Sequence, residues 1–255
     1  MLDIQNLRKS FGGVVATDNV SIFFPKGSLT AIIGPNGAGK TTFFNQITGH
    51  LTPNSGSIKL EGAELVGLKP REIVYRGVGR AFQVANIFPT FTVREALMAS
   101  IMAHQGHSER IFQLFHQDDL REKGDRLLKT LDLESVADEL CSNISHGDQK
   151  VLDIGLALAL EPSVLLLDEP TAGMGPDERW QMVRTVQRLW QENDLTLIFI
   201  EHDMDIVFEI AQKIHVLRYG SLIASGTADE IRRNEEVIEA YLGADIDLDG
   251  GPDHG

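Results

Sequence analysis

One short segment near the start of the chain constrains its fold more than any other. Eight consecutive residues match the spacing G-x-x-x-x-G-K-[ST]: Gly34, Pro35, Asn36, Gly37, Ala38, Gly39, Lys40 and Thr41. An apolar, β-prone run at 29–33 precedes them, and 41–47, which includes Thr42, has the pattern of a helix start. Glycines let the N–H groups of such a loop surround phosphate oxygens, and a helix N-terminus adds partial positive charge. The segment predicts a strand–loop–helix unit that binds a nucleoside triphosphate.

Two side chains at the end of this loop and two carboxylates further along the sequence are suited to binding a triphosphate with Mg²⁺. Lys40 is expected to reach the β- and γ-phosphates, and the Thr41 hydroxyl to hold Mg²⁺. The run 164–167 has no polar alternation, which is typical of a central strand covered on both faces, and Asp168 and Glu169 follow it. Asp168 at the strand end can hold Mg²⁺, usually through water, and Glu169 can polarise an attacking water. ATP and Mg²⁺ are therefore the expected ligands.

Bulk composition narrows the class of partner. The 255-residue chain carries a formal charge of −14, which repels phosphate backbones and argues against nucleic acid. No apolar stretch approaches the roughly 18–20 residues that span a bilayer, and the first residues lack a signal-peptide pattern. A single cysteine, Cys141, suits a reducing cytoplasm. Four aspartates among the last eleven residues predict a flexible acidic tail at 244–255.

The alternation of β-prone and helical segments favours an α/β fold with a mixed, mainly parallel sheet covered by helices. Strands are expected at 4–7, 20–24, 29–33, 57–60, 164–167, 195–200, 214–217 and 222–225. Helices are expected at 92–102, 109–114, 121–131 and 147–160, and Pro176 and Asp203 are expected to open two more. We expect one domain at 1–243, with an α/β core at 1–91 and 161–243 and a helical subdomain inserted at 92–160.

Several further residues become informative through their order. Ser145 is placed to cap the apolar helix that follows, and Gly147 permits close backbone approach. Phe11 lies before the phosphate loop, Gln83 between the loop and Asp168, and His202 after a second apolar strand. With these elements in this order, residues 2–243 resemble the ATP-binding subunit of an ABC (ATP-binding cassette) transporter. The resemblance implies a P-loop NTPase core of the ABC ATPase type, with an antiparallel β part at its N-terminus.

The resemblance also implies a role for each residue. Phe11 stacks on adenine, Gln83 touches Mg²⁺ and water, and His202 contacts the γ-phosphate. Ser145 and Gly147 close over the ATP that a second nucleotide-binding domain holds, so that two ATPs lie between two domains. The helical subdomains attach to transmembrane permease subunits at the cytoplasmic face of the membrane, and a solute-binding protein is an indirect partner. Hydrolysis by Glu169, Gln83 and His202 then drives transport.

Departures from the common family pattern narrow the subfamily. The usual Leu-Ser-Gly-Gly-Gln signature is changed at its first, third and fifth residues, which are Ile144, His146 and Asp148 here. Gly175 stands where an aspartate is usual. These segments, with 80–83 and 86–89, resemble the ATPases of branched-chain amino acid importers, and urea/amide importers are close relatives. An exporter ATPase is the nearest alternative. A soluble ABC-type ATPase is disfavoured by the single cassette and the acidic charge, and a kinase leaves 145–149 and His202 without roles.

Overall fold

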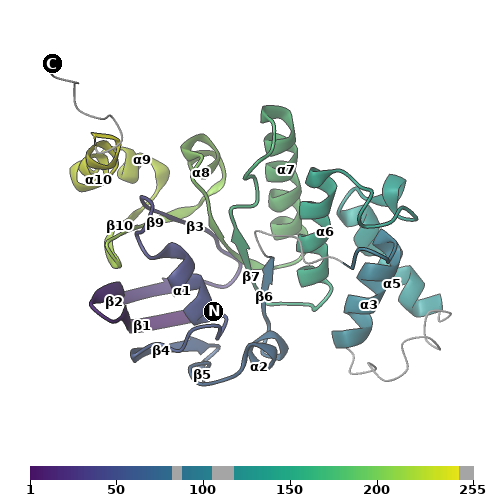
Figure 1. The fold of residues 1–255 in the computed structure, drawn as a ribbon, viewed down its shortest axis with the longest axis horizontal. Helices are drawn as coiled ribbons and strands as arrows, with labels where there is room; N and C mark the ends of the chain where they lie inside the picture. The colour runs from purple at the N-terminus through teal and green to yellow at the C-terminus, as the bar shows by residue number, and fades with distance from the viewer. Residues whose placement is uncertain (82–87, 105–117, 247–255) are drawn as a thin grey trace, which may run out of the picture. The chain divides into compact units, whose positions relative to one another are not determined.

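The computed structural model describes residues 1–81, 88–104 and 118–246 (Figure 1). The chain divides into two compact units. The first unit contains 1–25, 29–67 and the residues from 200 onward, and the second contains 26–28 and 68–199. The elements of the first unit are β1 (Leu2–Phe11), β2 (Val14–Phe24), β3 (Leu29–Ile33), α1 (Lys40–Ile47), β4 (Ser55–Leu60), β5 (Ala63–Glu64), α8 (Met204–Ile210), β9 (Lys213–Arg218), β10 (Ser221–Gly226), α9 (Ala228–Arg232) and α10 (Glu235–Ile246). Those of the second are α2 (Pro70–Tyr75), β6 (Val78–Ala81), α3 (Val93–His104), α5 (Asp118–Thr130), a 3-10 helix (Glu134–Val136), α6 (His146–Leu158), β7 (Val164–Asp168), α7 (Pro176–Glu192) and β8 (Thr196–Ile200).

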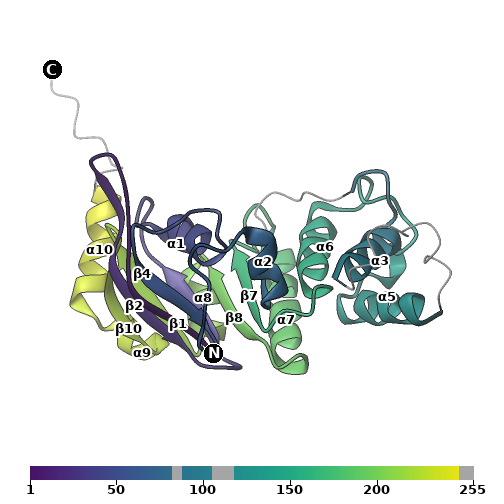
Figure 2. The ribbon, with the colours of Figure 1, turned by 90° about the horizontal axis from the view of Figure 1, so that it is seen from below.

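The first unit holds an antiparallel sheet, as predicted for the N-terminal part. Its strand order is β2-β1-β4-β5, with β1 antiparallel to both β2 and β4 (Figure 2). A second group of strands in this unit has the order β10-β9-β3, in which β3 runs parallel to β9. All five residues of β3 are buried, and Phe43 and Phe44 of α1 are fully buried as well. Strand β3 and helix α1 are thus anchored in the core on either side of the phosphate loop.

Strands β1 and β2 extend well beyond the predicted ranges. They form a hairpin whose turn includes Gly12, at a left-handed φ of 56°. Prediction from apolar alternation stopped at 4–7 and 20–24 because the distal halves of both strands are largely exposed. Register shifts between residues 4 and 10 also break the two-residue period that such a prediction relies on.

The second unit has the strand order β8-β7-β6, with β6 and β7 parallel. Residues 164–167 are completely buried, which confirms the interpretation of this run as a strand covered on both faces. Helix α7 begins at Pro176, as predicted, and the Gly175 N–H donates to Glu178 Oε2 at 3.1 Å. Strand β6 was not predicted, because Gly79 and Arg80 interrupt its apolar pattern. Helices α2, α9 and α10 were also absent from the predicted elements.

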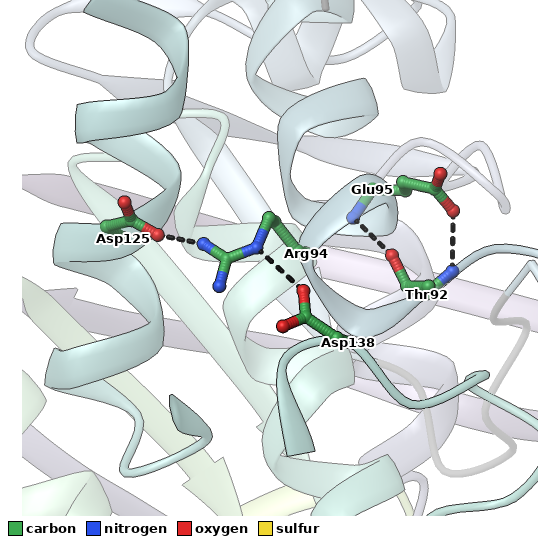
Figure 3. Close-up of polar contacts among 5 residues, drawn as sticks. All are labelled: Thr92, Arg94, Glu95, Asp125 and Asp138. Carbon is green, nitrogen blue, oxygen red and sulfur yellow. Dashed lines mark hydrogen bonds and ion pairs between the residues drawn. The ribbon is translucent and has the colours of Figure 1, made fainter. Parts of the chain in front are cut away.

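Three of the predicted helices in 92–160 are present as α3, α5 and α6; the fourth, at 109–114, lies outside the described residues. Figure 3 shows how α3 begins and is held. The Thr92 N–H donates to Glu95 Oε2 at 2.8 Å, and the Glu95 N–H donates back to Thr92 Oγ1 at 3.2 Å. Arg94 bonds to Asp125 on α5 and, at 3.1 Å, to Asp138. These contacts supplement a buried apolar cluster between α3 and α5.

Within 1–81, 88–104 and 118–246, none of the helices has the length and apolar character needed to cross a bilayer. The predicted division into a core and an inserted subdomain, and the acidic tail at 244–255, stay predictions. Residues 247–255 of that tail lie outside the described residues.

A buried histidine on β9 makes the stability of the first unit depend on pH. The His215 ring packs edge-on against Phe24 at 5.6 Å, and Nδ1 lies 2.6 Å from Ser225 Oγ. Burial, and secondarily the charge of Lys213, lower the pKa of His215 to about 4. The unfolded chain, with a histidine pKa of about 6.5, therefore binds more protons than the folded one between these values. The contribution of neutral His215 to folding stability is therefore complete above the unfolded-state pKa of about 6.5. It is lost as pH falls towards the folded-state pKa of about 4.

We expect the free energy of unfolding to decrease by roughly 3 kcal/mol from this group when pH falls from 7 to 4. Urea unfolding at several pH values measures the decrease. In the His215→Gln variant, which has no titrating ring, the free energy of unfolding should depend less steeply on pH. The remaining pH dependence comes from the carboxylates. Equal slopes in the two proteins would contradict the assignment.

Candidate functional site

The phosphate loop requires glycine at two positions for reasons of space. Gly34 and Gly39 have φ values of 150° and 99°, where residues with side chains are strained. A Cβ on Gly34 would lie 2.1 Å from the carbonyl oxygen of Leu217, and a Cβ on Gly39 would lie 2.1 Å from that of Ala16. Backbone therefore surrounds the loop closely on its inner side, and only glycine fits there.

Lys40 is the first residue of α1 and is only 7% exposed. Its Nζ donates to the carbonyl oxygens of Gly34 at 2.7 Å and Pro35 at 3.2 Å, so the ammonium group turns back into the loop. The first turn of α1 carries no acidic side chain, and Thr41 is exposed. A helix N-terminus, glycine backbone and a lysine gathered in this way suit a polyphosphate. The geometry of the loop fits the ligand that the sequence predicts.

Two residues far from the phosphate loop in sequence, Gly220 and Tyr241, contact its backbone. The Gly220 N–H donates to the Ala38 carbonyl at 3.0 Å, and the Asp18 N–H donates to Gly220 at 2.8 Å. Tyr241 on α10 contacts the same loop: burial raises the pKa of its phenol to about 12, although a backbone hydrogen bond with Gly34 opposes the rise. Sequence reasoning missed Tyr241, because nothing in its local pattern distinguishes it from an aromatic residue of the core.

Phe11 and His202 belong to the same unit as the phosphate loop. Phe11 ends β1, is 46% exposed, and has Lys9 Nζ at 5.3 Å from its ring centroid. His202 is exposed just after β8, and its N–H donates to Glu201 Oε2 at 3.2 Å. The predicted cap at Asp203 is present, since its carboxylate accepts from the N–H groups of Asp205 and Ile206. Both candidate side chains are thus accessible to a ligand.

Asp168 ends β7 in the second unit and forms a buried ion pair. Its Oδ2 lies 2.7 Å from Nη2 of Arg80 on the neighbouring strand β6, and the two side chains are only 5% and 8% exposed. A buried charge is tolerated when it is paired in this way. The carboxylate is the kind of oxygen donor that Mg²⁺ prefers. Arg80 was not predicted as its partner; a lone basic residue inside a short buried strand is the signal that could have indicated it.

Glu169 stands at the start of a tight turn with an unusual backbone. Its φ is 49°, in the left-handed region that costs a residue with a side chain about 1–3 kcal/mol. Its carbonyl accepts from the N–H of Ala172 at 3.2 Å and from Lys150 Nζ at 3.4 Å. These hydrogen bonds hold the turn that follows β7 and carries Glu169.

Ser145 caps α6, as predicted. Its Oγ accepts from the Asp148 N–H at 3.1 Å and donates to Asp148 Oδ2 at 2.7 Å, so the unusual aspartate is bonded to the serine. A Cβ at Gly147 would meet only Ser145 Oγ, at 3.8 Å, so the fold of this chain does not itself demand glycine there. Gln83 lies outside the described residues.

Comparisons with known proteins identify the family of this chain. The family model described as ABC transporter matches residues 17–172, and the model described as Branched-chain amino acid ATP-binding cassette transporter matches 221–247. The high-affinity branched-chain amino acid transport ATP-binding protein LivG of Salmonella typhimurium is 36% identical over 251 residues, covering 95% of this chain and 98% of its own. A probable LivG of Archaeoglobus fulgidus is 36% identical over 250 residues, covering 96% of each chain.

Solved structures give the same result. A nucleotide-free ATP-binding cassette from an ABC transporter has a TM-score of 0.82 and 31% identity, covering 94% of this chain and 98% of its own. The ADP conformation of such a cassette also has a TM-score of 0.82 and 31% identity, over 95% and 98% of the two chains. The chain therefore belongs to the ABC transporter family, as one of its ATP-binding and ATP-hydrolysing subunits.

Proposed function

We propose that this chain powers the import of branched-chain amino acids or of a closely related small polar solute. The observation that carries this choice is the match of residues 221–247 to the branched-chain amino acid cassette model. Relatives aligned with nearly the whole chain bear the same description in their names. The solute itself is selected by other subunits, so the assignment to this transport class rests on likeness rather than on a solute site in this chain.

Within the proposed ATPase cycle, each residue of the site has a defined task. The loop N–H groups and Lys40 bind the β- and γ-phosphates, and Phe11 stacks on the adenine. Thr41, Asp168 and Gln83 would hold Mg²⁺, partly through water. The ion, when bound, neutralises the charge of the phosphates. Glu169 accepts the proton of the attacking water, and His202 donates a hydrogen bond to the γ-phosphate.

The chain is proposed to work beside a second nucleotide-binding domain, either an identical copy or a paralogue. Ser145 and Gly147 at the N-terminus of α6 then contact the γ-phosphate that the partner holds, because a helix N-terminus favours an anion. Closing and opening of this pair moves the permease subunits to which the chain is attached at the cytoplasmic face of the membrane. A solute-binding protein delivers the solute, and nucleic acid has no part in the cycle.

The proposal is tested with the complete complex in liposomes, with the binding protein added outside. We expect a leucine-loaded binding protein to raise the ATPase rate several-fold and leucine to accumulate inside the liposomes. A complex with Lys40→Met should do neither, because the loop loses its only cationic side chain. Stimulation by an amide alone would reassign the solute, and ATP-driven loss of solute from the cytoplasmic side would favour an exporter.

A further inference from the structure

A buried lysine on α6 donates hydrogen bonds to the turn that carries Glu169. Lys150 is 6% exposed, and its Nζ donates to the carbonyl oxygens of Ala172 at 2.5 Å, Pro170 at 3.3 Å and Glu169 at 3.4 Å. All of these residues belong to the second unit. A buried ammonium group is costly unless it is well solvated by polar groups, and here backbone carbonyls supply that solvation. The lysine and the turn therefore depend on one another.

The turn needs such support because its backbone is strained. Glu169 has the left-handed φ noted above, and a residue keeps that conformation only when its surroundings determine it. The Lys150 ammonium draws the carbonyls of the turn to one point, which fixes the peptide plane that follows Glu169. The orientation of this plane also sets the direction in which the Glu169 side chain leaves the backbone. Lys150, Asp168 and Glu169 moreover line one small cavity, of about 10 Å³.

Ser145 caps the N-terminus of the same helix and Gly147 lies in its first turn, five and three residues before Lys150 (150 − 145 and 150 − 147). This end of α6 also lies near the turn, since a Cβ built on Gly173 would be 3.7 Å from His146 Nε2. A helix is rigid over one turn, so a shift at its N-terminus carries Lys150 with it. Contact of Ser145 with a partner's ATP and the orientation of Glu169 are thus mechanically connected through α6.

We propose that Lys150 is a positioning residue, which holds Glu169 in the orientation for hydrolysis and couples it to the state of the α6 N-terminus. The proposal rests on the roles proposed above for Glu169 and Ser145. Lys150 itself touches neither water nor phosphate in this scheme. It acts on the rate of hydrolysis and leaves nucleotide affinity to the phosphate loop.

The test compares Lys150→Met and Lys150→Arg in the complete complex, with Lys129→Met as control for loss of a lysine charge on the exposed surface of α5. Charged hydrogen bonds are worth about 1.5–3 kcal/mol, so we expect Lys150→Met to lower kcat by about 10- to 100-fold. The KM for ATP should change less than about threefold, by the same conversion of free energy to ratio. Lys150→Arg should restore most of kcat, and Lys129→Met should resemble the unmodified complex.

A purely structural role predicts a different pattern. It would lower the melting temperature, raise the KM for ATP and remain uncorrected by arginine, and that result would overturn the proposal. Equal kcat in Lys150→Met and the unmodified complex would overturn it too. The double variant Lys150→Met/Glu169→Gln supplies the third readout: if Lys150 acts through Glu169, it should be no slower than Glu169→Gln alone. Full activity of Glu169→Gln alone would instead refute the proposed catalytic role, separately from the result at Lys150.

Discussion

Replacing Glu169 with glutamine is expected to lower the rate of ATP hydrolysis by about 10²–10⁴-fold, the usual contribution of a general base. Glutamine keeps the size of the side chain but cannot accept the proton of the attacking water. ATP affinity should stay close to that of the unmodified protein, because the phosphate loop is unchanged. Phosphate release under single-turnover conditions measures the rate, and equilibrium binding of ATP measures the affinity.

The matched control is Glu161→Gln. Glu161 is an exposed glutamate of the same unit and has a similar left-handed φ of 50°, so the same chemical change is made in the same backbone conformation. It should leave hydrolysis unchanged. The proposed pairing of two domains adds a second readout, since ATP that cannot be hydrolysed should hold Glu169→Gln as a dimer on a sizing column. Hydrolysis by Glu169→Gln at the normal rate would assign the base to another residue.

Replacing Gly39 with alanine is expected to weaken nucleotide binding by about 100-fold or more. The added Cβ would lie 2.1 Å from the Ala16 carbonyl oxygen, a backbone atom that cannot simply rotate away. Left-handed strain of about 1–3 kcal/mol is added to this clash, and each 1.4 kcal/mol corresponds to about tenfold in affinity. The backbone of the loop would therefore have to change conformation just before α1. Its N–H groups would then no longer be directed together at the phosphates. Titration with a fluorescent ATP analogue measures the effect.

Alanine substitutions at two other glycines distinguish the effect of backbone strain from the effect of a steric clash. Gly37 lies in the same loop at a φ of 78°, but a Cβ there would meet nothing within 4 Å, so Gly37→Ala should weaken binding less than Gly39→Ala. Gly12, at a φ of 56° and equally open, lies in the hairpin turn outside the loop. Gly12→Ala should leave affinity unchanged. Normal binding by a folded Gly39→Ala protein would show that the loop conformation is not required for the nucleotide.

The sequence predicted those parts of the fold that local pattern determines. Strand 29–33, the buried run 164–167 and the helix opened by Pro176 were all placed correctly, because each has an apolar period or a punctuating residue of its own. Strand β6 escaped prediction because its place is set by pairing with β7 rather than by its own residues. Ser145 was also identified from local sequence, because a serine directly before an apolar helical segment is a typical N-cap.

The candidate site was predicted as a set of residues but not as a set of contacts. The pairing of Arg80 with Asp168 and the grip of Lys150 on 169–172 join segments distant in sequence, and a basic residue by itself does not reveal what it neutralises. A charge in the buried face of an apolar helix or strand was the available signal in both cases. The roles of Phe11, Gln83 and His202 stay predictions.

The phosphate loop is completed by residues that the ribosome adds long after the loop itself. The Leu217 carbonyl lies against Gly34, the Gly220 N–H donates to the Ala38 carbonyl, and Tyr241 on α10 contacts Gly34. During synthesis the loop emerges first, and the backbone that bonds to it follows 182 residues later (220 − 38). We therefore expect a nascent chain to acquire the nucleotide-binding conformation of this loop only after residues 217–241 have been made.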